Sequence, residues 1–422
     1  MFKSKLISAN VWLFLLLVVL TPFSIGYVWR TPLAISYLNL LAVALTLLSL
    51  TNLILGSLQW QKVGSKGLVY AIGLMALMLI WGSLFSQPLR SILGPWTSRF
   101  LQPLLVGYIG YTLLKQNHLK LSSLVTALWV GLALVATLGL LQWGGVVSSN
   151  NISRLTGFYA SPNSFARYIE LLLLLLAPYL LLVASRFRLG LALIWLGGLA
   201  VMLGTLSYGG TASFAIGLTV IILFLPQAWQ RLKIGFLILV IGSSLLAGIY
   251  REYLPKYNAT TTASTSSLNS RQQFWQIAWG AIKEHPLTGI GLEGWERQYP
   301  ELAQKHLSVT PIEAFSVQPH NIYLDAMLRA GILGLVAIIY LLFWPIVTTV
   351  RLAKSGLEKL GDDSWLVLGV LGYATSMILF GLVDDPIFSD DSMLMLFVIY
   401  FALASLFDNK KVFRPITTDL AV

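Results

Sequence analysis

Residues 318–350 read QPHNIYLDAMLRAGILGLVAIIYLLFWPIVTTV, and this stretch decides in which solvent most of the chain folds. From Ile332 to Val350 it contains no charged side chain. An apolar helix needs roughly 17 to 25 residues to cross the ~30 Å hydrocarbon core of a bilayer. The stretch therefore predicts a membrane-spanning helix, with Pro319, His320 and Asn321 at its mouth.

The composition of the whole chain also indicates a protein that folds mostly within a membrane. Of the 422 residues, 57% are hydrophobic and only 11% are charged, whereas soluble domains carry about 25% charged residues. We therefore expect an all-α polytopic membrane protein. The chain has no cysteine, which excludes disulfides and thiolate metal sites.

About twelve apolar runs are long enough to span a bilayer. Their centres lie near residues 19, 45, 77, 106, 131, 174, 198, 218, 241, 339, 374 and 399. The first run, residues 10–27, follows Lys3 and Lys5 as a signal peptide would, but it lacks a convincing cleavage site. We expect it to be a retained first helix.

The basic residues predict the orientation. Alternate short connections and both tails together hold sixteen Lys and Arg, whereas the opposite short connections hold only Arg30, Arg90, Arg99, Arg154 and Arg167. By the positive-inside rule, the richer side and both termini face the cytoplasm. The net charge of +11 is then mostly a topology signal, and we expect no nucleic-acid partner.

The outward arginines are unusual because the first 169 residues contain no Asp or Glu. Snorkelling to lipid headgroups is the expected role of Arg30 and Arg90. Arg154 and Arg167 instead flank a predicted helix start at Asn163, in RLTGFYASPNSFARYIE (154–170), and a helix start beside arginines suits an anion. Alternatively, Ser161 and Asn163 are ordinary capping residues.

In that alternative Arg167 pairs with Glu170 one turn further along the helix. The sequence leaves both possibilities open.

The one long hydrophilic segment runs from Arg251 to about Arg329 and lies outside on this topology. In SRQQFWQIAWGAIKEHP (270–286), Ser270 is a plausible N-cap of an amphipathic helix, and its tryptophan face predicts a location at the membrane interface. Arg271 would then oppose the helix dipole, a penalty that a bound anion would remove. The glycines of PLTGIGLEGW (286–295) more plausibly shape a turn than a dinucleotide site.

His320 lies at the external mouth of the span that follows. On a helix starting at Pro319, it shares a face with Tyr323, while Asp325 and Arg329 form an i, i+4 pair elsewhere. We expect His320 to lie at the same depth in the membrane as Arg154 and Arg271, and Asn321 is available to orient a ligand. This position indicates a chemical role for the imidazole. The other histidines, His118, His285 and His306, are expected to be solvated.

A last polar cluster, VDDPIFSDD (383–391), joins the final two spans. Asp384, Asp385, Asp390 and Asp391 could hold a hard divalent cation, neutralise the external arginines, or cap the last helix through Asp390. We favour structural roles, with Asp384 and Asp390 supporting the site residues and no metal bound.

Four motifs together resemble the O-antigen ligase and polymerase superfamily of bacterial membrane glycosyltransferases. They are RLTGFYASPNSFA (154–166), SRQQFWQIAWGAIKEHPLTGIGLEGW (270–295), PHNIYLDAMLRAGILGL (319–335) and GLVDDPIFSDD (381–391). The resemblance implies a GT-C-like bundle of about 12 transmembrane helices with one large periplasmic loop that contains short amphipathic helices. It also implies glycan transfer from undecaprenyl diphosphate to an acceptor, without metal or nucleotide cofactor.

Under this resemblance the family's loop histidine falls on His320 and its loop arginine on Arg271. Members commonly carry Arg after Ser between the seventh and eighth helices, but LSYGGTAS (206–213) has Tyr208 there. A diphosphate contact is then missing, or is supplied by Arg154 or Arg167.

The resulting hypothesis is an O-antigen ligase-type, inverting, metal-independent glycosyltransferase in the bacterial inner membrane, with its active site facing the periplasm. His320 is the general base, and the donor glycan and diphosphate are held by Arg154, Arg271, Arg167, Asn163, Asn321 and Tyr323. The acceptor is lipid A core or another envelope molecule, since the chain ends a few residues after the last span, without the extra domain of protein-glycosylating relatives. Membrane lipids are the remaining partners.

The domain organisation expected from these spans is residues 1–250 for spans one to nine, residues 251–328 for the external loop, and residues 329–422 for the last three spans and a short tail. Two other functions stay open. One is an O-antigen polymerase that joins lipid-linked repeats, and the other is a small-anion transporter. Against the transporter, the two halves show no clear inverted repeat.

Overall fold

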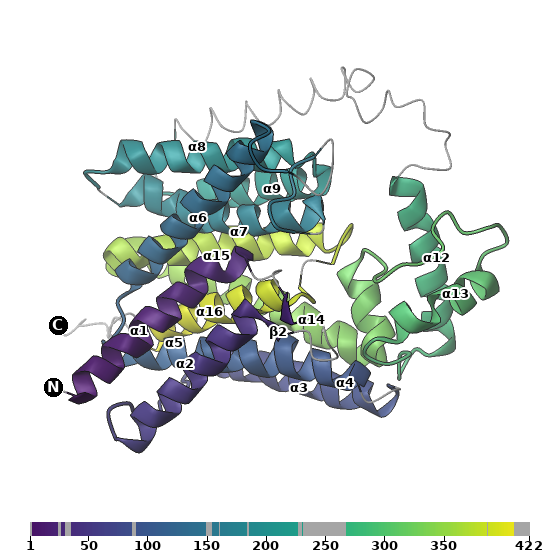
Figure 1. Ribbon diagram of the computed structural model, residues 1–422, viewed down its shortest axis with the longest axis horizontal. Helices are drawn as coiled ribbons and strands as arrows, with labels where there is room; N and C mark the ends of the chain where they lie inside the picture. The colour runs from purple at the N-terminus through teal and green to yellow at the C-terminus, as the bar shows by residue number, and fades with distance from the viewer. Residues whose placement is uncertain are drawn as a thin grey trace, which may run out of the picture.

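The computed structural model describes residues 2–23, 27–29, 35–86, 90–148, 154–159, 161–183, 185–226, 230, 267–385 and 387–408. Apart from one short antiparallel hairpin, β1 (Tyr27–Trp29) with β2 (Ile35–Ser36), these residues form helices and their connections. Figure 1 shows most of the helices running side by side as one bundle, with α12 and α13 grouped at one end of it.

Eight of the described helical segments are long and apolar enough to span a membrane, which confirms a polytopic membrane protein. They are Lys3–Phe23, Tyr37–Ile54, Lys66–Leu84, Leu121–Trp143, Pro162–Leu182, Ile322–Lys354, Leu357–Phe380 and Asp390–Phe407. Two shorter apolar helices, α8 (Arg188–Gly204) and α9 (Tyr208–Phe224), match two further predicted runs. The predicted run near residue 241 lies outside the described residues.

The predicted run near residue 106 is not one regular helix. It consists of α4 (Arg90–Trp96), a π-helical turn η2 (Thr97–Leu101) and α5 (Gln102–Lys115). Pro95 and Pro103 lack the N–H that would continue a regular hydrogen-bond ladder, which explains the interruption.

The first helix differs from its predicted bounds. α1 spans Phe2–Leu20, and Thr21–Phe23 form a 3-10 turn, η1. Pro22 has no backbone N–H and its ring disfavours a continuing α-helix, so the chain leaves the helix before Tyr27. Tyr27 therefore lies in β1 rather than in the first span.

Burial separates the centre of the bundle from its rim. In α16 (Asp390–Phe407) 89% of the residues are buried, against 28% in α2 (Tyr37–Ile54). α16 packs on α5, while α15 (Ser364–Phe380) packs on both α7 (Pro162–Leu182) and α9. The helices α7, α15 and α16 therefore form the core, and α2 presents most of its surface outward.

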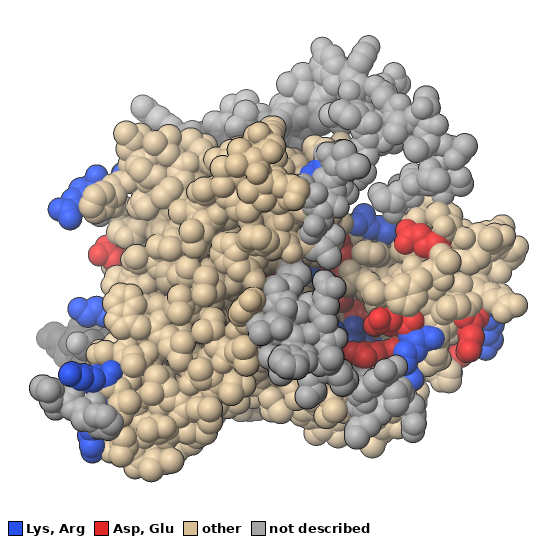
Figure 2. All heavy atoms as spheres, viewed as in Figure 1, with Lys and Arg blue, Asp and Glu red and all other residues tan. Residues whose placement is uncertain are grey.

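The two ends of the bundle differ in charge. α1 begins and α16 ends at the same end, and Figure 2 shows Lys and Arg gathered there, with a belt of other residues separating them from the charged groups at the opposite end. Asp408 accepts hydrogen bonds there from the Gly64 backbone N–H at 2.8 Å and the Tyr111 hydroxyl at 2.6 Å. Gln116, just after α5, donates to the Gln59 carbonyl at 2.6 Å. The connection from α2 to α3 (Lys66–Leu84) and the connection from α5 to α6 (Leu121–Trp143) therefore meet at one end, as their alternation predicts.

α14 (Ile322–Lys354) connects the external segment to the bundle, and it bends. At Ala330 and Gly331 the backbone leaves the helical conformation, with φ of 60° at Gly331. A Cβ on Gly331 would lie 2.3 Å from the carbonyl group of Leu287, so only glycine allows this close crossing. α14 packs with α3, α12, α13 and α15, and its apolar contacts with α12 and α13 come from the part before the bend.

The amphipathic helix begins earlier than predicted. α12 spans Ser267–Glu284, so Ser270 lies inside the helix and Arg271 lies beyond its first turn. The dipole argument for an anion at Arg271 is therefore wrong. The apolar stripe also faces protein: Phe274, Ala278 and Ile282 are buried against α13 (Gly294–His306), whereas Trp279 remains exposed.

The glycines of PLTGIGLEGW do shape a turn. Gly289 and Gly291 have φ of 65° and 91°, and this turn leads from α12 into α13. Of the other histidines, His118 and His285 are exposed as predicted, whereas the His306 side chain is only 13% exposed and lies 3.7 Å from Glu284. The prediction that His306 is solvated is therefore wrong.

Candidate functional site

His320 does not lie on α14 but just ahead of it. Asn321 is the N-cap, and its side-chain oxygen accepts hydrogen bonds from the backbone N–H groups of Tyr323 and Leu324 at 3.0 and 3.1 Å. The predicted helix start at Pro319 is therefore wrong, and His320 shares no helical face with Tyr323. His320 itself has φ of 51°, a left-handed conformation that a residue with a side chain adopts at a cost of order 1 kcal/mol or more.

Contacts on several sides fix the strained histidine. Its ring stacks on Phe274 of α12, with centroids 5.7 Å apart, and its carbonyl accepts a hydrogen bond from the Trp275 indole at 3.4 Å. Its Nδ1 lies 2.9 Å from Oδ1 of Asp384. The side chain remains 29% exposed, so the imidazole is held firmly and is still accessible.

Asp384 is the centre of the cluster, and its residue is only 5% exposed. Besides His320, Oδ1 accepts hydrogen bonds from the Gln318 side chain at 3.2 Å and from the Asp385 backbone at 2.9 Å. Oδ2 accepts a hydrogen bond from the Asn163 side chain at 3.1 Å and lies 3.7 Å from Arg271.

These partners decide the charge of the buried carboxylate. Burial raises the pKa of Asp384. The hydrogen bond and charge of His320 and the charge of Arg271 lower it by more than burial raises it, so the pKa of Asp384 lies below its usual value. Asp384 is therefore an anion at neutral pH. Because the Asp384 carboxylate accepts a hydrogen bond from Nδ1, Nδ1 carries the proton. In a neutral imidazole Nε2 is then unprotonated, and its lone pair is free to accept a proton.

Arg154 reaches the same place from the segment before α7. Its guanidinium donates to the carbonyls of Thr205 at 2.7 Å and Leu206 at 3.3 Å, and to the Asn163 side chain at 3.2 Å. Asn163 thus bridges Arg154 to Asp384. Burial lowers the pKa of Arg154, and the positive charge of Arg271 lowers it as well, because the two guanidiniums lie close enough to repel each other.

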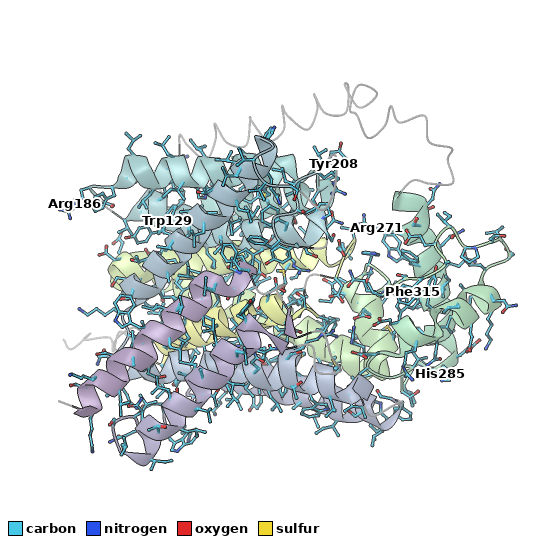
Figure 3. All side chains as sticks on the ribbon, in the orientation of Figure 1. Trp129, Arg186, Tyr208, Arg271, His285 and Phe315 are labelled. Carbon is cyan, nitrogen blue, oxygen red and sulfur yellow. The ribbon has the colours of Figure 1, made fainter. Side chains whose placement is uncertain are left out.

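The cluster forms where α12 approaches the bundle. Figure 3 shows Arg271 between α12 and the bundle, and Tyr208 at the end of α9 on the same side of the molecule. Two cations held close together with an aspartate and a histidine form a site for an anion next to a proton acceptor. Arg154, Arg271, His320 and Asp384 come from four separate segments of the chain.

Arg167 has a different setting. It is 6% exposed and donates to the Asp385 carbonyl at 2.9 Å and the Ser389 hydroxyl at 3.0 Å, while Glu170 accepts from Ser213 at 2.7 Å. Neither alternative from the sequence describes this arrangement, because the partner of Arg167 is the connection between α15 and α16. The guanidinium fastens that connection, which also carries Asp384.

Asn321 and Tyr323 also make contacts that hold the fold. Besides capping α14, Asn321 donates to the Leu382 carbonyl at 3.0 Å, and the Tyr323 hydroxyl donates to the Ile378 carbonyl at 2.8 Å. Both side chains fasten the start of α14 to the end of α15. Their polar atoms are thereby engaged away from Asp384.

Asp390 belongs to a neighbouring cluster. Ser389, not Asp390, occupies the N-cap position of α16. Asp390 accepts a hydrogen bond from Ser98 at 3.0 Å and lies 3.5 Å from Arg99, which is also 4.0 Å from Glu293. Within the described ranges, no three or more metal-binding side chains gather in one place. Arg30 and the side chain of Arg90 lie outside what the structure describes.

Sequence reasoning missed two contributors. Gln318 joins Asp384 and lies 3.5 Å from His320 Nδ1, and its only signal is its position two residues before the histidine. Phe274 stacks on the imidazole, and nothing local in the sequence indicates this partner.

The fold and the site define a class: a polytopic helical membrane protein with a histidine and arginine cluster at one end of its bundle. Residues 191–339 match the family described as O-antigen ligase (Wzy_C), so the chain carries a domain of this family. The match includes α12, α13, Arg271 and His320, whereas Arg154 and Asp384 lie outside it.

One curated relative comes from Haemophilus influenzae (strain ATCC 51907 / DSM 11121 / KW20 / Rd) and is described as an uncharacterized protein. It is 32% identical over 130 residues, which is 31% of this chain and 30% of the relative. The similarity thus spans less than a third of the length of that protein.

Proposed function

We propose that this protein is an O-antigen ligase-type glycosyltransferase that moves a glycan from undecaprenyl diphosphate to a hydroxyl of lipid A core or another cell-envelope acceptor. The family domain over residues 191–339 supports the class of reaction. The observation that carries the proposal is the joining of His320, Arg271 and Arg154 around Asp384, directly or through Asn163.

His320 acts as the general base. With Nδ1–H donating to Asp384, Nε2 accepts the proton of the acceptor hydroxyl as its oxygen attacks the anomeric carbon. The new glycosidic bond forms on the face opposite the leaving group, so the configuration inverts. The imidazolium that results is stabilised by the Asp384 carboxylate, whose depressed pKa keeps it ionised.

The arginines stabilise the leaving group. The bond between the anomeric carbon and the diphosphate oxygen breaks with its electron pair, and negative charge grows on undecaprenyl diphosphate. Arg271 lies 3.7 Å from Asp384, and its positive charge lowers the pKa of Arg154. The two guanidiniums stabilise the negative charge of the leaving diphosphate. This role requires no resident metal ion or nucleotide.

The position of Arg154 bears on Tyr208, which stands where family members commonly carry Arg. Arg154 donates to the carbonyls of Thr205 and Leu206, just ahead of Tyr208. Its guanidinium therefore occupies the turn in which the family arginine would begin. Arg154 is the better substitute for that contact, because Arg167 is bound to the connection after α15.

The location follows from the same proposal. Arg271 of the site lies at the end of the bundle opposite to the end where Lys and Arg gather (Figures 2 and 3), and the lysine-rich connections are expected to face the cytoplasm. We therefore place the protein in the bacterial inner membrane, with both termini cytoplasmic and His320 facing the periplasm.

Reconstitution of the purified full chain in liposomes tests the function. The vesicles receive radiolabelled undecaprenyl-diphosphate glycan with either lipid A core or unlabelled lipid-linked repeats as acceptor. Label transferred to lipid A core is expected, and EDTA should leave the rate unchanged. Label found only in longer lipid-linked chains identifies a polymerase, and folded protein that transfers to neither acceptor contradicts the proposal.

A further inference from the structure

A cavity of ≈ 220 Å³ lies beside the His320 cluster. Its lining includes Arg99, Glu293, Trp295, Glu296, Gln318 and Arg329. Gln318 belongs to both places, because its side chain lines this cavity and donates to Asp384. We call this space the acidic cavity.

The charges of the acidic cavity favour hydrogen-bond donors over anions. Its two arginines already face carboxylates: Arg329 donates to Asp325 at 2.6 Å, and Arg99 lies 3.5 Å from Asp390. Glu293 and Glu296 stand three residues apart around the start of α13. With Asp325 they give the lining more carboxylates than guanidiniums.

One residue of the lining, Trp295, has an unsatisfied buried donor. Trp295 is only 3% exposed, and its indole N–H has no hydrogen-bond partner among the residues that the structure describes. A buried donor without a partner is rare in folded proteins. The carboxylates of the lining accept hydrogen bonds from hydroxyls, and the Gln318 amide can both donate and accept, which matches the hydroxyl groups of a sugar.

The volume limits the ligand. Pockets for drug-sized ligands measure about 300 to 1,000 Å³, so ≈ 220 Å³ suits a smaller group, such as one sugar ring. An anionic sugar would meet the three carboxylates, and like charges at close range disfavour binding.

We propose that the acidic cavity binds the terminal sugar of the acceptor, and that it selects an uncharged or amino sugar over a phosphorylated one. This inference rests on the proposed function and adds the chemistry of the acceptor. Gln318 forms the wall shared by the acceptor sugar and the Asp384 carboxylate, so a sugar in the cavity lies next to the catalytic cluster.

Acceptor kinetics of the purified full chain test the inference. At saturating donor, E296Q should raise the KM for a lipid A core ending in an unphosphorylated hexose by about tenfold or more, the loss expected for a hydrogen bond to a charged group. The kcat and the donor KM should stay within about twofold. The matched control is E301Q, since Glu301 is exposed on the same helix and does not line the cavity.

A charge reversal sharpens the test. The wild-type protein should prefer the unphosphorylated core to the same core phosphorylated on its terminal hexose, and E296K should weaken or reverse that preference. Equilibrium binding of both cores to the H320A variant supplies a readout that does not depend on turnover.

The outcomes separate the two proposals. Wild-type transfer with equal acceptor KM values for E296Q and E301Q, or with no preference between the cores, overturns the acidic cavity as acceptor site and leaves the proposed function standing. Absence of wild-type transfer to every acceptor overturns the proposed function, and the inference falls with it.

Discussion

Replacing Asp384 by asparagine removes the charge at the centre of the cluster while keeping its shape. In the structure the carboxylate accepts from His320 Nδ1 at 2.9 Å, from Gln318 and Asn163, and lies 3.7 Å from Arg271. An asparagine oxygen can accept part of these bonds, but it neither stabilises an imidazolium by charge nor fixes one tautomer. The substitution therefore slows the transfer of the proton from the acceptor hydroxyl to His320.

The size of the effect follows from what a general base contributes. Such assistance is typically worth 10²- to 10⁴-fold, or about 3 to 6 kcal/mol of activation free energy at about 1.4 kcal/mol per tenfold. We expect D384N to lower kcat by about that factor and to change the donor KM much less. Single-turnover transfer of radiolabelled glycan by reconstituted protein measures both quantities.

A matched variant separates chemistry from folding. Asp391 is also a buried aspartate near the same connection, but its carboxylate accepts a hydrogen bond from Tyr159 at 2.9 Å and does not contact His320. D391N should cost thermal stability and retain kcat in the folded fraction. If folded D384N keeps a kcat within about threefold of wild type, the account of Asp384 as partner of the base is refuted.

Three further predictions follow from the same structure. R271A should raise the donor KM by about 10- to 100-fold, since a hydrogen bond to a charged group contributes about 1.5 to 3 kcal/mol. The control variant R167A should mainly lower the unfolding temperature. Equal donor KM values for R271A and wild type would exclude the contact between Arg271 and the diphosphate. The stability that charged Asp384 contributes should be lost only as the pH falls through its lowered folded pKa, which lies below the unfolded value of about 3.9, so the melting difference between wild type and D384N should not shrink between about pH 8 and 5 and should shrink under more acidic conditions. A difference that declines from pH 7 to 5 contradicts the depressed pKa. G331A should destabilise the protein by about 1 to 3 kcal/mol, because φ is 60° and the new Cβ would meet the Leu287 carbonyl. The control G73A, with open space around it, should be neutral or stabilising in the same thermal scan. Equal melting temperatures for the two variants would rule out the close approach of Gly331 to Leu287.

Local signals in the sequence were sufficient for much of the fold. The apolar runs predict most of the described helices, because length and hydropathy alone decide whether a helix can cross a bilayer. The Asp325 and Arg329 pair was predicted from their spacing and is present at 2.6 Å. Helix starts were less predictable, since Asn321 rather than Pro319 begins α14 through its capping bonds.

The partners across the site could not be predicted in the same way. Arg99 has no acidic residue near it in the sequence, yet Glu293 and Asp390 approach it in the fold. Likewise, Phe274, Ala278 and Ile282 of the apolar stripe of α12 face α13, and Phe274 contacts His320. The contacts of Arg99 and of His320 join residues more than 40 positions apart, and no local periodicity encodes them.

The central claim is that His320 removes the proton from the acceptor. Its most direct test is single-turnover glycan transfer by reconstituted H320A protein, with donor binding measured on the same preparation. The account predicts a rate about 10²- to 10⁴-fold below wild type with donor affinity nearly unchanged. Transfer by H320A at the wild-type rate would contradict it.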